Sequence, residues 1–187
     1  MHSLAARQQG YFTAAQAREL GYSYQAQKYQ ADAGNWTKVD RGIYRLPEWP
    51  VGQYEHLVQW TLWSGGCAVV SHATALAAYD LGDLNPSVVH LSVPPGFRRS
   101  APAITVHRTL PPPRYIRESN GFRISAPDRA LAEIAADHVD QHQLDIAVAD
   151  VLDRAISTPR QLRDAAAEIG ASAELGIERA LAAFRKQ

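Results

Sequence analysis

The sequence has few or none of the features on which several common protein classes depend. Cys67 is the only cysteine among 187 residues, so neither an internal disulfide nor a cysteine-based zinc site can form. No apolar run approaches the roughly 18 to 20 residues of a membrane span, and the first ten residues lack the apolar core of a signal peptide. We therefore expect a soluble, cytoplasmic protein without membrane contact.

A net charge of either sign is also missing. The chain carries 19 basic and 19 acidic residues, so no global field favours nucleic acid as a partner. The charges are nevertheless uneven, because two basic segments, 1–50 and 91–130, alternate with the acidic segments 51–90 and 131–187. Lysine is scarce, and the preference for arginine suits phosphate contacts but also fits a biased genomic base composition.

Motifs for nucleotide cofactors are absent, since neither GxxxxGK nor GxGxxG occurs. No lysine stands between Val39 and Arg185, whereas one common nuclease arrangement needs a lysine beside clustered carboxylates. We therefore expect no catalytic residues, no cofactor and no metal.

Two short helices and a hairpin are predicted between residues 11 and 46. Thr13 can N-cap a helix over 14–20, Gly21 fits its C-terminal end, and Ser23 can cap a second helix that runs to about Ala33. Two short β-prone runs follow, Trp36 to Val39 and Ile43 to Leu46, around Asp40-Arg41-Gly42. This order predicts a winged helix-turn-helix, with a further short helix over 3–9.

In such a module the second helix and the wing would contact DNA. The N-terminal residues of a recognition helix reach base edges, and basic residues on a wing contact phosphate. The predicted DNA-binding residues are Ser23, Tyr24, Gln25, Gln27, Lys28, Lys38, Arg41 and Arg45. The alternative is an ordinary solvated helix face on a module that contacts protein. The apolar face of this helix is faint, because Ala26 with Tyr29 competes with Tyr24 and Ala31.

The remainder predicts a mixed α/β segment and then helices. Pro47 to Pro50 marks a domain boundary, which gives two domains, 1–50 and 51–187. The expected elements are helices over 53–63 and 71–79, strands over 67–70, 88–93 and 104–108, a hairpin at Asn120-Gly121, and helices over 125–136, 141–155, 159–169 and 173–185. Ser71 can cap the helix that it precedes, and Ser125-Ala126-Pro127-Asp128 and Thr158-Pro159-Arg160-Gln161 have the form of a capping box with proline near the first helical position. The fold class is α+β, an N-terminal winged helix-turn-helix followed by a mixed α/β domain with a helical end.

Several histidines invite a metal or catalytic interpretation. His138 and His142 are spaced like a helical zinc pair but lack the adjacent glutamate of a metalloprotease. Ser71 and His72 are adjacent, so their side chains should diverge and form no nucleophile-base pair. Whether His72, His90 and His107 converge is left open by the sequence.

A second basic cluster could form another nucleic-acid surface or a docking site for an acidic partner. The alternative is that its members face the acidic helices after residue 131. The cluster consists of Arg98, Arg99, Arg108, Arg114, Arg117, Arg123 and Arg129.

With these residues in view, the chain resembles the AbiEi family of antitoxins from bacterial type IV toxin-antitoxin systems. The resemblance rests on the order and spacing of seven short segments. They are Gly10-Tyr11-Phe12-Thr13, Gly21-Tyr22-Ser23, Gly34-Asn35-Trp36, Arg41-Gly42-Ile43-Tyr44-Arg45-Leu46, Val70-Ser71-His72-Ala73-Thr74-Ala75-Leu76, Val89-His90-Leu91-Ser92-Val93 and Ser125-Ala126-Pro127-Asp128-Arg129-Ala130-Leu131.

The resemblance implies a DNA-binding module that represses its own operon at inverted repeats, with dimerisation possible on the DNA. It also implies a C-terminal domain that counters a nucleotidyltransferase toxin, either by direct binding or only functionally. The nuclease-like extension of some longer relatives is not expected here. Two other hypotheses stay open, a module that holds the toxin without binding DNA, and an enzyme acting on nucleic acid through His72, His90 or Asp128.

Overall fold

The computed structural model describes residues 1–137 and 139–186, which form two compact units. The first unit comprises residues 1–68 together with Glu118–Phe122, and the second comprises residues 69–117 with the described residues from 123 onward. The predicted domain boundary at residue 50 stays a prediction. Among the described residues, no helix has the length and apolar character that crossing a membrane requires.

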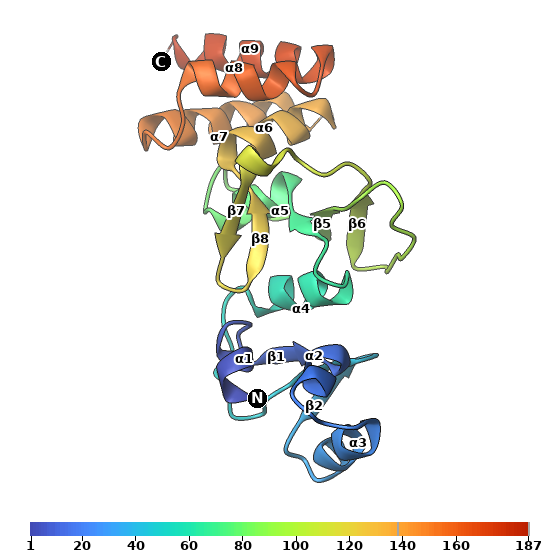
Figure 1. Ribbon diagram of the computed structural model, residues 1–187. Coiled ribbons are helices and arrows are strands. Elements are labelled where there is room, and N and C mark those ends of the chain that lie inside the picture. Colours follow the sequence, from blue (N-terminus) through green and yellow to red (C-terminus); the bar gives the residue numbers. More distant parts are fainter. Residues whose placement is uncertain (138, 187) are drawn as a thin grey trace. The chain divides into compact units, whose positions relative to one another are not determined.

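The first unit combines short helices with a three-stranded antiparallel sheet in the order β1-β3-β2. Helices α2 and α3 are joined by a short turn, and β2 and β3 form a hairpin (Figure 1). The elements are α1 (His2–Ala6), β1 (Tyr11–Thr13), α2 (Ala14–Glu19), α3 (Tyr24–Asp32), β2 (Thr37–Asp40), β3 (Ile43–Arg45) and α4 (Glu55–Trp63).

Local capping signals place both central helices of this unit. The Thr13 hydroxyl accepts the Gln16 N–H while the Gln16 side chain accepts the Thr13 N–H, which is a complete capping box. Ser23 caps α3 by accepting the Ala26 N–H. The predicted helices and hairpin are therefore confirmed, and β1 is an addition, because three residues are too few to show a periodic pattern.

Aromatic side chains form the core of the first unit. Phe12 from β1 meets Trp36 edge to face, with ring centroids 4.8 Å apart, and stacks on Tyr44 at 5.8 Å. Trp36 is only 5% exposed and also contacts Tyr22 in the turn between α2 and α3. Burial of these rings therefore joins the sheet to the helical pair.

The second unit contains most of a five-stranded sheet in the order β6-β5-β4-β8-β7. Strands β5 and β6 run parallel, as do β4 and β8, whereas β4 and β5 are antiparallel. The elements are β4 (Val69–Val70), α5 (His72–Ala78), β5 (Val89–Ser92), β6 (Ile104–His107), a 3₁₀ turn (Pro113–Tyr115), β7 (Ile116–Ser119) and β8 (Phe122–Ser125).

The hairpin between β7 and β8 follows the prediction. Asn120 and Gly121 both adopt positive φ, 39° and 93°, as a tight two-residue hairpin turn of type I′ requires. The hairpin tip groups with the first unit, where the Gln9 side chain donates to the Asn120 carbonyl at 2.9 Å.

Four helices follow the sheet in sequence and pack together, with α9 in contact with each of the other three (Figure 1). Leu131, Leu144, Leu162 and Ile177, one from each helix, are fully buried. The helices are α6 (Pro127–Ala136), α7 (Gln141–Asp153), α8 (Pro159–Ala167) and α9 (Ala171–Phe184).

Two predicted caps in the second unit differ from the structure. Ser71 makes no side-chain cap to α5, and α6 begins after Ala126, so Ser125 caps nothing. Pro127 in the first turn of α6 needs no N–H partner, which explains why that helix starts without a capping side chain. At Thr158 the predicted capping box with Gln161 is confirmed. The helices and strands of the described residues confirm the predicted α+β class.

Candidate nucleic-acid interface

The first turn of α3 points its side chains to solvent. Ser23, Tyr24 and Gln25 are exposed, and Tyr24 is 63% exposed despite its large ring. The Arg18 guanidinium donates to the Tyr24 hydroxyl at 3.2 Å and lies 5.0 Å from its ring centroid. Helix α2 thus fixes the orientation of Tyr24 and places a positive charge beside it.

Lys28 lies one turn further along α3 and is also exposed. It forms an ion pair with Asp32, and both side chains are more than half exposed. Asp32 raises the pKa of Lys28 through this hydrogen bond. Exposed ion pairs contribute little to stability, so a phosphate or a base edge can displace Asp32 from Lys28 at small cost.

Gln27, in contrast, is buried and therefore does not belong to the predicted set of DNA-contacting residues. It is 1% exposed, and its amide nitrogen donates to the carbonyls of Ala14 and Tyr22, both at 3.0 Å. The side chain therefore joins α3 to the start of α2 and to the turn between them. The weak apolar pattern of α3 did not reveal this face, because a polar residue occupies its most buried position.

Replacement of Gln27 tests this structural role. Gln27→Leu removes both hydrogen bonds and should lower the free energy of unfolding by about 1–3 kcal/mol, because two buried carbonyls lose their donor. The exposed Gln25→Leu should change stability by less than about 0.5 kcal/mol. Urea unfolding of both variants measures the difference. An unchanged free energy of unfolding in Gln27→Leu would contradict the structural role of Gln27.

Arg45 is the second predicted DNA-contacting residue whose side chain is largely buried. Its guanidinium donates to the carbonyls of Trp49 and Pro50 and pairs with Glu55 at 3.0 Å, and only 13% of the side chain is exposed. Arg45 thus ties β3 to the start of α4 rather than facing solvent. Its partner carboxylate lies ten residues away, so the local sequence gave no signal of this contact.

The β2–β3 hairpin keeps the other two predicted basic residues exposed. Lys38 on β2 and Arg41 in the turn both face solvent. A backbone irregularity between Lys38 and Asp40 shifts the register of the hairpin, and Gly42 closes the turn with φ of 72°. Lys38 and Arg41 therefore stay in the predicted phosphate-contacting set.

Tyr29 is an exposed residue of α3 that the sequence interpretation did not assign. It is 68% exposed, and it lies four positions after Gln25 and so on the same helical face. The outward face of α3 thus carries Tyr24, Gln25, Lys28, Tyr29 and Asp32.

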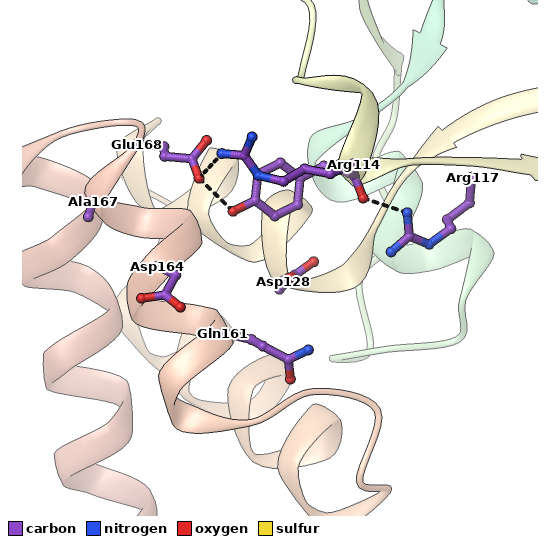
Figure 2. A pocket seen from close by; sticks show the side chains of 8 residues that line it. Arg114, Arg117, Asp128, Gln161, Asp164, Ala167 and Glu168 are labelled. Atoms are coloured by element: carbon purple, nitrogen blue, oxygen red, sulfur yellow. Dashed lines mark hydrogen bonds and ion pairs between the residues drawn. The ribbon is translucent and has the colours of Figure 1, made fainter.

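In the second unit, Asp128 lies in an open groove of about 590 Å³ (Figure 2). Burial raises the pKa of the Asp128 carboxyl. Arg114 on the groove wall pairs with Glu168, which also accepts the Tyr115 hydroxyl at 2.8 Å. Acidic and basic side chains therefore both line the groove.

Two arginines of the second basic cluster pair with residues after 131. Arg114 pairs with Glu168 on the segment that ends α8, and Arg129 donates to the buried Glu133 at 3.0 Å. For Arg114 the alternative is correct, whereas Arg129 pairs with a residue of its own helix, α6.

The adjacent pair Ser71 and His72 contradicts its prediction. The Ser71 hydroxyl and Nδ1 of His72 lie 2.9 Å apart, because the backbone of His72 adopts a left-handed φ of 52° that turns its ring toward Ser71. Ser71 is 0% exposed, so its hydroxyl orients the imidazole and is not accessible as a nucleophile. The predicted spacing of His138 with His142 lies outside the described residues.

Comparison with known proteins finds a family match over the segment that carries the candidate interface. Residues 2–47, which are 46 of the 187 residues, match a family described as a transcriptional regulator, the AbiEi antitoxin. The matched segment contains α1 to α3, all three strands of the small sheet, and each residue of the predicted interface.

The fold is also similar to a solved structure, the RV2827C protein from Mycobacterium tuberculosis. The TM-score is 0.64 at 16% identity, and the match covers 97% of this chain and 75% of that chain. At this identity the match shows a shared fold. No curated protein matches the sequence.

Proposed function

We propose that the first unit binds double-stranded DNA as a winged helix-turn-helix and that the protein is a transcriptional regulator. Helix α3 is then the recognition helix and the β2–β3 hairpin is the wing. The observation that carries the proposal is the exposed first turn of α3, which presents Ser23, Tyr24 and Gln25 within the segment that matches the regulator family.

The exposed side chains suit different parts of the DNA. Gln25 can pair bidentately with adenine, and Lys28 can reach guanine in the major groove. Lys38 and Arg41 contribute charge for phosphate contacts, which position the module without reading sequence. Because the whole chain has no net charge, affinity must come from these local contacts.

We further propose that the protein is an antitoxin that represses its own operon. Repression requires only that α3 and the wing occupy promoter DNA, so this role needs no enzymatic activity. One module covers few base pairs, and two copies on an inverted repeat, with half-sites about 34–36 Å apart, would supply the specificity. The toxin to be countered is a nucleotidyltransferase, and a protein acting on operon DNA would be cytoplasmic.

Removal of the wing charges tests DNA binding. Lys38→Ala/Arg41→Ala should weaken binding to the upstream DNA of its own operon by about tenfold or more, and should reduce the slope of log K against log salt by about two, roughly one per phosphate contact. Gel-shift titration at several salt concentrations measures both quantities.

The matched control removes the same charge from the second unit. Arg160 and Lys186 are exposed there, so Arg160→Ala/Lys186→Ala should bind this DNA like the wild type. Equal binding by the wing variant and the wild type would exclude Lys38 and Arg41 from the interface. Equal loss in both double variants would point to a non-specific charge effect and contradict the proposal.

A second candidate function is supported by the apolar exposure around α3. Leu20, Tyr24 and Tyr29 are 49%, 63% and 68% exposed, and exposed aromatic residues are typical of protein interfaces. On this alternative the first unit holds the toxin directly. Stable co-purification with the neighbouring gene product, lost in Tyr24→Ala/Tyr29→Ala, together with no DNA retardation at moderate salt, would favour it.

A further inference from the structure

Three imidazole rings meet in the second unit, each from a different element. His72 begins α5, His90 lies on β5, and His107 ends β6. The ring centroids of His72 and His107 are 3.5 Å apart, and those of His90 and His107 are 5.3 Å apart. One ring nitrogen from each residue lies within 4.8 Å of the other two.

The Asp137 carboxylate approaches the same cluster from the end of α6. One of its oxygens lies 3.5 Å from Nε2 of His72 and 3.9 Å from Nδ1 of His107. The Asp137 side chain is 51% exposed, so it stands on the solvent side of the cluster. The cluster therefore has an accessible side, with a carboxylate placed there.

We propose that the three histidines bind Zn²⁺ or a similar borderline divalent metal, with the Asp137 carboxylate beside them as the partner of Nδ1 of His107. Three imidazoles are a donor set that Zn²⁺ favours. The proposal does not rest on DNA binding, since every group involved lies in the second unit.

The spacing of the nitrogens is close to that of a zinc site, but one ring must reorient. The planes of the stacked His72 and His107 rings are only 16° apart, and parallel rings do not direct their lone pairs at one point. Nδ1 of His90 and Nε2 of His107 are 3.0 Å apart, close to the roughly 3.3 Å that separates two ligand atoms of a tetrahedral zinc ion. The third nitrogen lies within 4.8 Å of these two and must approach by at most roughly 1.5 Å to reach the same separation. Rotation of the half-buried His90 and His107 side chains can supply this movement, since His72 is only 6% exposed.

The surroundings of His72 orient it as a ligand. Its Nδ1 faces the Ser71 hydroxyl at 2.9 Å and the Glu133 carboxylate at 3.6 Å, which leaves Nε2 directed toward Asp137. In metal sites, a hydrogen bond at the nitrogen that does not bind the metal fixes the orientation of the histidine ring. Its strained φ of 52° is held by a hydrogen bond from the backbone N–H to Glu133.

The protonation state of the cluster also suits a metal ligand. Burial, together with the nearby His107 and His90, lowers the pKa of His72 to about 2. Burial likewise lowers the pKa of His90 and of His107. Neutral imidazoles keep the lone pairs that coordinate a metal.

Direct metal titration tests the proposal. The full chain, freed of metal by a chelator, should bind one Zn²⁺ per chain by calorimetry and by elemental analysis after dialysis, and should not bind Mg²⁺, which prefers oxygen ligands. At a hundredfold excess of Zn²⁺ over its Kd, Tm should rise by about 5–10 °C. No bound Zn²⁺ in the wild type would overturn the proposal.

Variants locate the ion. His90→Gln/His107→Gln should lose the bound Zn²⁺, while the exposed pair His2→Ala/His142→Ala should keep it. Asp137→Asn, at a half-exposed position that the fold tolerates, should weaken Zn²⁺ binding about tenfold or more. Retention of Zn²⁺ by the His90→Gln/His107→Gln protein, or its loss only from the His2→Ala/His142→Ala protein, would place the ion elsewhere and refute the proposal.

Discussion

Gly82→Ala is expected to lower the free energy of unfolding by about 2–5 kcal/mol. Gly82 has φ of 73°, which costs an L-residue about 1–2 kcal/mol. A Cβ at this position would also lie 2.4 Å from Cβ of Ala147 and 2.8 Å from its Cα, so the backbone of α7 would have to move. Overpacking of this kind adds about 1–3 kcal/mol. Urea unfolding followed by circular dichroism measures the loss.

Gly65 offers a control with nearly the same backbone conformation. Its φ is 75°, but nothing lies within 4 Å of a Cβ built there. Gly65→Ala should therefore cost only the conformational part, about 1 kcal/mol. The difference between the free energies of unfolding of the two variants measures the effect of the close approach of Gly82 to α7. Equal losses of stability in both variants would show that this approach imposes no steric limit.

Arg129→Met should destabilise the protein by about 3–5 kcal/mol. Arg129 and Glu133 are 7% and 5% exposed and pair through Nε and Oε1 at 3.0 Å. Removing the guanidinium leaves a buried carboxylate without its counter-charge, which costs far more than the pair itself contributes. Thermal unfolding should show a fall in Tm of about 2–4 °C for each kcal/mol.

Two further variants separate this effect from the loss of a side chain. Arg129→Met/Glu133→Gln removes both charges and keeps an acceptor for the His72 N–H, so it should recover a large part of the stability. Arg160→Met breaks an exposed pair with Asp164 at the same i,i+4 spacing and should cost less than about 0.5 kcal/mol. A double variant as unstable as Arg129→Met would contradict an electrostatic cause.

The predicted elements that the structure confirms share a local cause. The capping boxes at Thr13 and Thr158 each join atoms only three residues apart. The hairpin at Asn120-Gly121 depends on the backbone preference of two adjacent residues. Such signals operate within a single turn of chain, so they can be interpreted without knowing the fold.

The exposure of the proposed interface residues was predicted only in part. Ser23, Tyr24 and Gln25 at the start of α3 are exposed as expected, whereas Gln27 in the next turn is buried. The competing apolar stripes of α3 could not decide its orientation. The orientation of α3 is instead set by the hydrogen bonds from Gln27 to two backbone carbonyls. A hydrophobic pattern does not reveal hydrogen bonds of this kind.

The sequence by itself determined the approximate positions of the helices and turns, and the α+β class that their order implies. Only the tertiary structure decided that Arg45 serves the fold, that Glu133 supports the backbone of His72, and that three histidines meet. The reason is distance along the chain, because Glu133 and His72 are separated by 61 positions. Contacts between such remote residues follow from how β5 and β6 pair and how α5 and α6 pack, and no local pattern records that packing.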